Sequence, residues 1–197
     1  MIVNNLWQTE EDEFGALSVL NNICRYNTRY RIKDETVAAH SFFVVWFTSV
    51  LCSYFDVEDD VKVLAMEAAM LHDVPEIYIN DITYDCKSRI PEVVKAIEAH
   101  EREVLKGLSD TAQYVLFEPR TPEEKLAGAI VRYADVISVK QYSLAEMNLG
   151  NKTFKDIFEG AQQRLDELKT DVNDALDFYE RKRAHKRLMR GVQDAEE

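Results

Sequence analysis

Residues that interrupt helices are scarce in this chain. Only 6 Gly and 4 Pro are spread over its 197 residues, which leaves little material for the many tight turns of a β-rich fold. Between these residues, apolar side chains recur at three- and four-residue spacing, which is the pattern of helices with one buried face. No segment alternates convincingly in the way that a half-buried strand would. The sequence therefore predicts an all-α fold, organised as a single compact helical bundle.

Helix periodicity and breakers define the expected elements. We expect helices over residues 11–24, 35–54, 56–70, 91–108, 111–116, 122–147 and 154–190. Asp34 is the expected N-cap of the second helix, and Pro122 has the first-turn position that proline favours. Residues 25–33 combine basic and aromatic side chains and are expected to form a loop. Pro75 is expected to interrupt the chain after the third helix.

The pair Gly150-Asn151 divides the chain into a main domain, residues 1–150, and a C-terminal helical extension, residues 151–197, which is expected to pack on the same domain. The extension carries a basic tail, because residues 181–190 contain six Lys or Arg and no acid. Without these six charges the formal net charge of −12 would be −18, so nucleic acid is not an expected partner. We expect the tail to be an exposed helix end, favoured by the helix dipole, or to dock on an acidic partner subunit.

The cysteines and the N-terminal sequence indicate a cytoplasmic protein. Cys24, Cys52 and Cys86 are far apart and form no CxxC pair, so we expect reduced thiols and no disulfide framework. The N-terminal segment lacks the basic region of a signal peptide. An anionic substrate of such an acidic chain would have to be attracted by a local positive site, either a metal ion or a few placed cations.

One segment is apolar enough to be compared with a membrane span. Residues 37–55 contain no Asp, Glu, Lys or Arg, which nearly meets the length of a transmembrane helix. The segment also contains His40 and several Ser and Thr residues. A central helix that is packed on all faces explains this composition better than insertion, and we expect no membrane association.

Histidine and acidic residues are concentrated in the motif LHDVPEIYINDI. His72 and Asp73 end an apolar helix, and Glu76 and Asp81 follow at short spacing. Neutral imidazole nitrogen and carboxylate oxygen together suit a borderline divalent cation such as Mn, Co, Fe or Zn. No cysteine lies close to the pair in sequence.

Two further candidates lie in apolar surroundings. His40 is either a core histidine that is hydrogen-bonded to a backbone carbonyl group or a metal ligand, and the first is the more common role for a lone histidine on an apolar face. Asp135 interrupts an apolar run on a long helix, and a buried carboxylate needs a partner. From the residues alone, Arg132, Arg25 and a metal ion are equally good partners for it.

These motifs together carry a family resemblance. They are ETVAAH at 35–40, HDVPE at 72–76, Asp81, and Ala134-Asp135. One His, an adjacent His-Asp pair and a distant Asp resemble the pattern of the HD-domain metal-dependent phosphohydrolase superfamily. The closer likeness is to the YfbR-type 5′-deoxyribonucleotidases, because Arg25-Tyr26 stands where that group has Arg-Trp and an acidic helix start precedes the final Asp. The resemblance covers about residues 12–150.

The resemblance implies a metal centre. His40, His72, Asp73 and Asp135 would hold one divalent transition metal ion, which is Co, Mn, Fe or Zn. Four such ligands leave room on an octahedral ion for a water molecule and a phosphate oxygen. Asp73 and Glu76 are the implied catalytic residues, with Glu76 as the acid–base group that positions the water or protonates the leaving 5′-oxygen.

The resemblance also implies the substrate contacts. Arg25 would bind phosphate through its planar guanidinium group, Tyr26 would lie against the nucleotide, and Asp81 would accept a hydrogen bond from the 3′-hydroxyl group. Lys87 and Glu118 are weaker candidates, because a lysine at a helix start and an acid in a surface loop are commonly exposed to solvent.

A deoxynucleotide is thus the expected small-molecule substrate. The implied reaction is divalent-metal-dependent hydrolysis of deoxyribonucleoside 5′-monophosphates to deoxynucleoside and phosphate, by a homodimer. Two alternatives remain: a deoxynucleoside triphosphate triphosphohydrolase that releases tripolyphosphate, and a nucleotide-binding regulator without turnover. The regulator is disfavoured because all four ligands and Glu76 are present. The chain departs from the family at Tyr26, at Val74-Pro75, and beyond residue 150, where no likeness is found.

Overall fold

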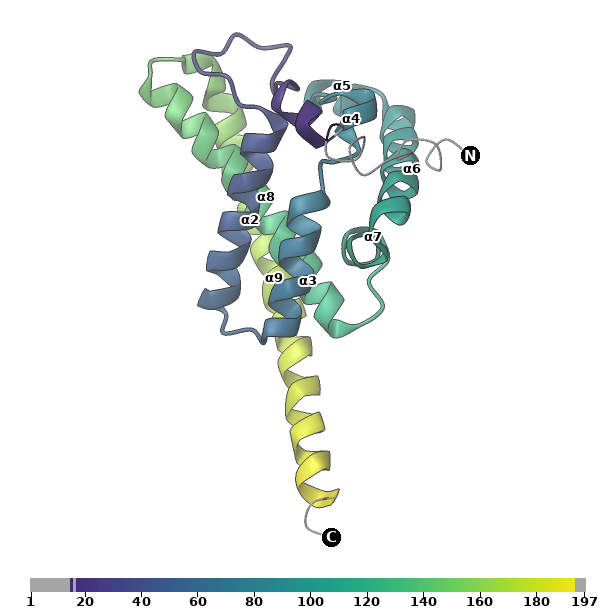
Figure 1. The fold of residues 1–197 in the computed structure, drawn as a ribbon. Coiled ribbons are helices and arrows are strands. Elements are labelled where there is room, and N and C mark those ends of the chain that lie inside the picture. Colours follow the sequence, from purple (N-terminus) through teal and green to yellow (C-terminus); the bar gives the residue numbers. More distant parts are fainter. Residues whose placement is uncertain (1–14, 16, 194–197) are drawn as a thin grey trace.

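Helix α8 (Pro122–Asn148) lies at the centre of the molecule, where it contacts α2, α3, α7 and α9. The computed structural model describes residues 15 and 17–193 (Figure 1). The other helices are α2 (Val37–Tyr54), α3 (Asp59–Leu71), α4 (Glu76–Ile79), α5 (Tyr84–Arg89), α6 (Pro91–Leu108), α7 (Asp110–Phe117) and α9 (Lys155–Gln193), with short 3-10 turns η2 (Val19–Asn21) and η3 (Lys152–Phe154). No strand occurs among the described residues, so the all-α expectation is confirmed.

The start of α8 is fixed by a capping box. The Thr121 hydroxyl group accepts a hydrogen bond from the backbone N–H of Glu124 at 3.1 Å, and the Glu124 carboxylate accepts one from the backbone N–H of Thr121 at 2.9 Å. Pro122 occupies the first turn, as expected. Gly128 then lets α7 approach closely, because a Cβ atom there would lie 2.4 Å from the Val115 carbonyl oxygen.

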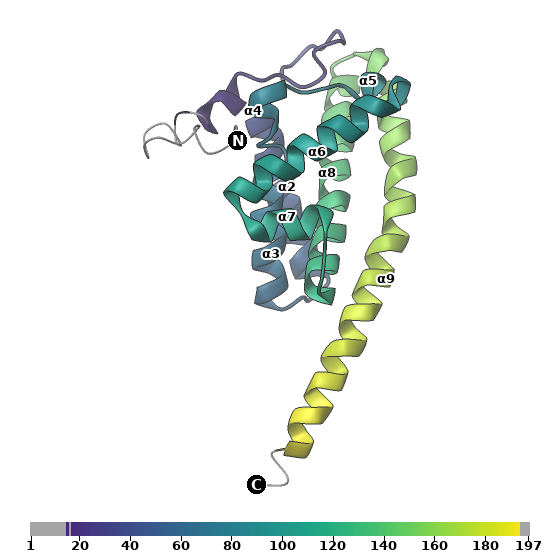
Figure 2. The ribbon, with the colours of Figure 1, turned by 90° about the vertical axis from the view of Figure 1, so that its right-hand side faces the viewer.

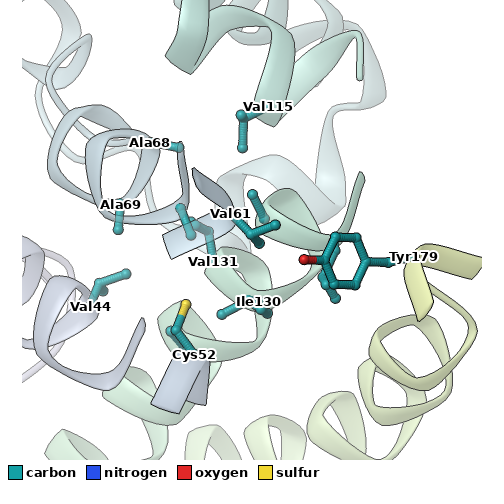
Figure 3. Close-up of a cluster of buried hydrophobic side chains, with 13 residues drawn as sticks. Val44, Cys52, Val61, Ala68, Ala69, Val115, Ile130, Val131 and Tyr179 are labelled. Carbon is teal, nitrogen blue, oxygen red and sulfur yellow. The ribbon is translucent and has the colours of Figure 1, made fainter. Parts of the chain in front are cut away.

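The main core joins α2, α3, α7 and α8, and Tyr179 of α9 closes it (Figure 3). Small and branched side chains fill it, including Val44, Ala68 and Ile130, all of which are fully buried. Burial of each larger aliphatic side chain contributes roughly 1.5–3 kcal/mol. This packing holds α2, α3 and α8 in a rigid arrangement, and these three helices carry the histidine and aspartate candidates.

Helix α2 begins two residues later than expected. The cap is Thr36, whose hydroxyl group accepts from the Ala39 backbone N–H at 3.1 Å, whereas Asp34 accepts from Arg31 Nε at 2.5 Å. The cause is long-range, because Thr36 is extended and forms a bridge with Cys24. The helix can therefore start only after Thr36, and the expected N-cap at Asp34 was wrong.

The same bridge shortens the expected first helix. Residues 11–14 and 16 lie outside the described part of the chain, and residues 15, 17 and 18 are helical. The described remainder ends in the 3-10 turn η2, three residues before Cys24. Residues 25–33 form the expected loop. The short helices α4 and α5, which follow Pro75, were not expected.

The outer side of α2 corrects another expectation. Phe42, Trp46, Val50 and Tyr54 lie one turn apart and are exposed, with 58% of the Trp46 surface accessible. The helix is thus packed on one side only and not on all faces. By length and composition it is the one helix among the described residues that could cross a membrane. Its opposite side, which includes His40 and Thr48, is buried in the bundle.

Helix α9 runs along α8 and then continues past the bundle (Figures 1 and 2). Tyr179 is the last of its fully buried side chains in the described range. Beyond it, Arg183 and Arg187 reach Glu58 at 2.7 and 3.5 Å. The rest of the described basic tail is an exposed helix end.

Candidate active site

Three helices bring the predicted metal ligands together. His40 comes from α2, His72 and Asp73 follow the end of α3, and Asp135 comes from α8. His40 Nε2 lies 3.0 Å from Asp135 Oδ1 and 3.6 Å from Asp73 Oδ2, and His72 Nε2 lies 3.3 Å from the same Asp73 oxygen. The ligand atoms of His40, His72 and Asp73 all lie within 4.8 Å of one another.

The two imidazole rings are oriented as metal ligands commonly are. His72 Nδ1 lies 2.8 Å from the Ala69 carbonyl oxygen, which can only accept, so Nδ1 carries the hydrogen. His40 Nδ1 lies 3.1 Å from the Ser138 hydroxyl oxygen. Hydrogen bonds at Nδ1 of this kind leave Nε2 free to coordinate a metal ion.

The centre of this group has unsatisfied polar atoms. Both Nε2 atoms are buried and make no hydrogen bond, which is costly unless something else binds them. Two imidazole nitrogens facing carboxylate oxygens form a donor set that suits a divalent transition metal ion. The residues present therefore fit the metal centre that the sequence predicts.

Electrostatics in the group favour positive charge at its centre. Burial alone would raise the pKa of Asp73, but the facing His72 and the Arg25 guanidinium group outweigh it and hold that pKa well below its usual range. Burial lowers the pKa of His72, yet the Asp73 carboxylate raises it to about 9. Burial lowers the pKa of His40. The carboxylates thus stay ionised and attract a cation.

Among the described residues, Asp135 pairs with His40 and forms no ion pair with Arg25 or Arg132. Arg25 instead donates from Nη1 to Asp73 Oδ2 at 2.9 Å, with Nε 3.6 Å from Glu35 Oε2. Burial raises the pKa of Glu35 to about 7. No role was predicted for Glu35 from the sequence; the available signal was its position five residues before His40, at the start of an apolar helix.

Glu76 begins helix α4 and is buried. Its Oε2 atom has no hydrogen-bond partner. Burial, helped by the nearby Asp73 carboxylate, raises the pKa of Glu76 to about 9. The group therefore holds a proton at neutral pH, which it is able to donate.

Asp81 supports the loop that carries Arg25. Its Oδ2 atom accepts from the backbone N–H of Tyr26 at 3.1 Å. Tyr26 has a φ of 56°, which is uncommon for a residue other than glycine. Its ring stacks on Tyr142 at 5.0 Å, with an interplanar angle of 8°, and contacts Phe154 edge-on at 5.2 Å. One face of the Tyr26 ring is thus covered by protein.

These side chains open onto one cavity of about 810 Å³. The predicted site residues that line it are Arg25, Tyr26, Asp73, Glu76, Asp81, Lys87 and Asp135. Residues of α9 line it too. They were not predicted, because no family likeness was expected beyond residue 150.

Glu118, the remaining predicted substrate contact, lies away from the other candidate site residues. It caps the C-terminal end of α7, is 48% exposed, and pairs with Arg102 at 3.1 Å. It does not line the cavity. The structure therefore gives no support to the predicted contact between Glu118 and the substrate, because its carboxylate is held on the surface by Arg102.

A helical bundle that brings a His, a His-Asp pair and an Asp together beside one cavity has the arrangement of an HD-domain phosphohydrolase. A profile described as 5′-deoxynucleotidase YfbR-like matches residues 13–182, and the chain belongs to that family. It is accordingly a metal-dependent phosphohydrolase that acts on nucleotides. The match continues well into α9, so the expectation that the likeness ends near residue 150 was wrong.

Solved structures share the fold. A protein from Pyrococcus horikoshii OT3 is 21% identical, with a TM-score of 0.66 over 85% of this chain and 96% of that one. An HD-domain phosphohydrolase from Listeria innocua is 23% identical, with a TM-score of 0.60 over 87% and 85%. The cyanophage S-2L HD phosphohydrolase DatZ, bound to dA and one catalytic Zn²⁺ ion, is 18% identical, with a TM-score of 0.60 over 88% and 96%. No curated protein sequence matches the chain.

Proposed function

We propose that this protein hydrolyses deoxyribonucleoside 5′-monophosphates to deoxynucleoside and phosphate. The observation that carries the proposal is the convergence of His40, His72 and Asp73 ligand atoms within 4.8 Å, beside a cavity that Arg25 and Glu76 line. Cavities of 300–1,000 Å³ are typical of small-molecule sites. A cavity of about 810 Å³ accommodates a nucleotide.

His40, His72, Asp73 and Asp135 would hold one divalent ion, of which Co, Mn, Fe and Zn are all compatible with this donor set. When bound, such an ion makes hydroxide available near neutral pH and offsets charge on phosphoryl oxygens. The catalytic Zn²⁺ in the DatZ structure supports this assignment.

Arg25 binds the phosphate. One of its five N–H donors is held by Asp73 at 2.9 Å, and this bond fixes the guanidinium plane beside the metal ligands. Because Nε faces Glu35, the remaining N–H groups of the two Nη atoms bind the phosphoryl oxygens, in the paired geometry that arginine favours. Lys87 of α5 lies in the same cavity wall and adds positive charge near the phosphate.

Glu76 supplies the proton that the leaving group needs. Its neutral carboxyl group donates to the 5′-oxygen while the bond between phosphorus and that oxygen breaks, so that a hydroxyl group leaves. Asp81 accepts a hydrogen bond from the 3′-hydroxyl group of the sugar. Because Asp81 also holds the backbone of Tyr26, sugar binding and phosphate binding share one loop.

The charges in the cavity favour a monophosphate over a triphosphate. Six acids and four basic residues line it. Arg29 is paired with Asp156 at 2.8 and 3.0 Å, and Arg164 with Glu167 at 2.8 Å. A triphosphate carries about four negative charges and normally recruits several cations. With Arg25 held by Asp73, three of the four basic residues are already engaged by carboxylates.

The acting form is a cytoplasmic homodimer. The three free cysteines are compatible with a reducing compartment. The exposed side of α2 supports a second copy as the partner, because its large side chains, such as Phe42 and Trp46, are apolar and the helix carries no charge. Two acidic chains would approach with least repulsion along such a face, in a twofold arrangement.

A substrate panel tests the proposal. Purified protein with Mn²⁺ or Co²⁺ is incubated with deoxynucleoside monophosphates, ribonucleoside monophosphates and deoxynucleoside triphosphates, and the products are separated by ion-exchange chromatography. Phosphate released fastest from the deoxynucleoside monophosphates is the expected result. Faster release of tripolyphosphate from the triphosphates would assign the alternative reaction, and nucleotide binding without any product would indicate a regulator.

A further inference from the structure

The cavity has a second half that the reaction does not use. Besides the residues assigned to the reaction, its lining includes Val136 and Val139 of α8 and a face of α9. On α9 the cavity-lining residues recur at helical spacing, so they form one continuous face. They are Asp156, Ile157, Gly160, Ala161, Arg164 and Glu167.

Gly160 leaves open space on this face. A Cβ atom at this position would have no atom within 4 Å, in contrast to Gly128, where a Cβ atom would lie 2.4 Å from a carbonyl oxygen. Packing therefore does not require a glycine at residue 160. A glycine in a helix interior costs about 1 kcal/mol relative to alanine. Its effect in this structure is to widen the cavity beside α9.

A nucleobase needs an apolar surface, and Tyr26 offers only part of one. Tyr142 stacks on one face of the Tyr26 ring, and Phe154 contacts it edge-on. Val136, Val139 and Ile157, in contrast, line the cavity with aliphatic side chains. Aliphatic walls with few polar groups are typical of sites that bind flat aromatic rings.

Polar groups follow one turn further along α9. Arg164 donates from Nη1 to Glu167 Oε2 at 2.8 Å, and both side chains are about half exposed at the cavity rim. The pair presents N–H donors and a carboxylate acceptor beside the apolar walls. A base that lies against Gly160 would meet these groups with its polar edge.

We infer that the α9 face formed by Ile157, Gly160, Ala161 and Arg164 is the base-binding subsite. It takes the nucleobase of a deoxynucleotide, and the missing side chain at residue 160 makes room for the second ring of a purine. The inference rests on the proposed function, because the sugar and phosphate are placed by Asp81 and Arg25. It assigns to α9 a specificity role that is separate from the chemistry.

The test is Gly160→Leu, which fills the open space and favours helix formation. Gln162→Leu is the matched control, because Gln162 lies on the same helix, is exposed and does not line the cavity. Both variants and the wild type are assayed with dAMP, dCMP and 2-deoxyribose 5-phosphate, which has no base. Circular dichroism melting confirms that each protein is folded.

Gly160→Leu should lower kcat/KM for dAMP by at least about tenfold. This is the loss expected when a binding pocket is too small for its substrate by one or two methylene groups. The loss for dCMP should be smaller, and 2-deoxyribose 5-phosphate should change by less than about twofold. Gln162→Leu should match the wild type. An equal loss on all three substrates, or no loss on dAMP, would overturn the subsite.

Binding separates this inference from the proposed function. Isothermal titration calorimetry with deoxyadenosine requires no turnover, and Gly160→Leu should weaken that binding by about tenfold or more. If the wild-type protein hydrolyses none of the three substrates but shows this difference in binding, the subsite stands and the proposed reaction fails. Equal deoxyadenosine affinity in wild type and Gly160→Leu removes the subsite, whatever the protein hydrolyses.

Discussion

Arg25 Nη1 donates a hydrogen bond of 2.9 Å to Asp73 Oδ2, across 48 residues of sequence. The same Asp73 oxygen lies 3.3 Å from His72 Nε2 and 3.6 Å from His40 Nε2. Arg25, the proposed phosphate-binding cation, and the proposed metal ligands are therefore one connected group. A phosphate bound by Arg25 would lie beside the proposed metal centre.

Glu76→Gln should keep the metal ion and slow turnover of dAMP by roughly 10²–10⁴, the usual range for the loss of an acid–base group. The reason is that the proposed mechanism assigns the transferable proton to Glu76 and the metal ion to four other side chains. Steady-state kinetics and metal analysis of the same preparation check this. Loss of the ion together with activity would mean that Glu76 is a ligand.

Glu35→Gln should change how stability depends on pH. Burial raises the pKa of Glu35 from 4.5 to about 7, so the folded state binds this proton more tightly than the unfolded state. The stabilisation is fully present below pH 4.5 and is lost as the pH rises to about 7. Glutamine does not titrate, so the variant should lack this loss.

Urea unfolding at pH 5 and pH 7.5, with chelator present, measures the difference. From pH 5 to pH 7.5 the unfolding free energy of the wild type should fall by about 2 kcal/mol relative to that of Glu35→Gln. This is somewhat less than the free energy that corresponds to the whole shift in the pKa of Glu35. Curves for the two proteins that run parallel over this range would contradict the assigned burial of the carboxyl group.

Asp81→Ala should remove the preference for a 3′-hydroxyl group. The wild type is expected to use dAMP better than 2′,3′-dideoxy-AMP by about tenfold, the value of one hydrogen bond to a charged group. The variant should use both at similar, reduced rates, because the Tyr26 loop also loses its support. A preference for dAMP that survives in Asp81→Ala would place the sugar elsewhere.

Trp46→Lys should produce a monomer. Trp46 is 58% exposed in the uncharged face of α2, and two lysines facing each other across a twofold axis would repel. Light scattering coupled to size-exclusion chromatography gives the mass directly. Lys169→Ala, at an exposed position of α9, is the control. A wild-type protein that is monomeric at micromolar concentration would exclude this interface.

Local sequence signals predicted much of the fold. Helix α6 begins at Pro91 and ends at Leu108, as its periodicity and breakers indicate. The capping residues before α8 and the proline in its first turn also act locally. The start of α2 was misplaced because a long-range bridge between Cys24 and Thr36 selects the cap.

The metal-ligand candidates were predicted from the sequence, whereas the wall formed by α9 was not. His40, the His72–Asp73 pair and Asp135 are separated widely in sequence, and only the resemblance to the HD-domain family indicated that they meet. The wall formed by α9 has no motif, because Gly160 and Ile157 acquire a role only through the way in which α9 lies along α8. Pair partners such as Asp156 for Arg29 also depend on that packing.

The most direct test of the central claim is a metal titration of chelator-treated protein, with phosphate release from dAMP as the readout. Activity should be absent before Mn²⁺ or Co²⁺ is added, rise in proportion to the metal, and saturate at about one ion per chain, as expected for a single centre. Asp73→Asn should bind the ion at least about 100-fold more weakly and stay inactive, because a neutral amide does not offset the charge of the ion. Phosphate release that persists without metal, or full occupancy and normal activity in Asp73→Asn, would contradict the metal centre formed by these residues.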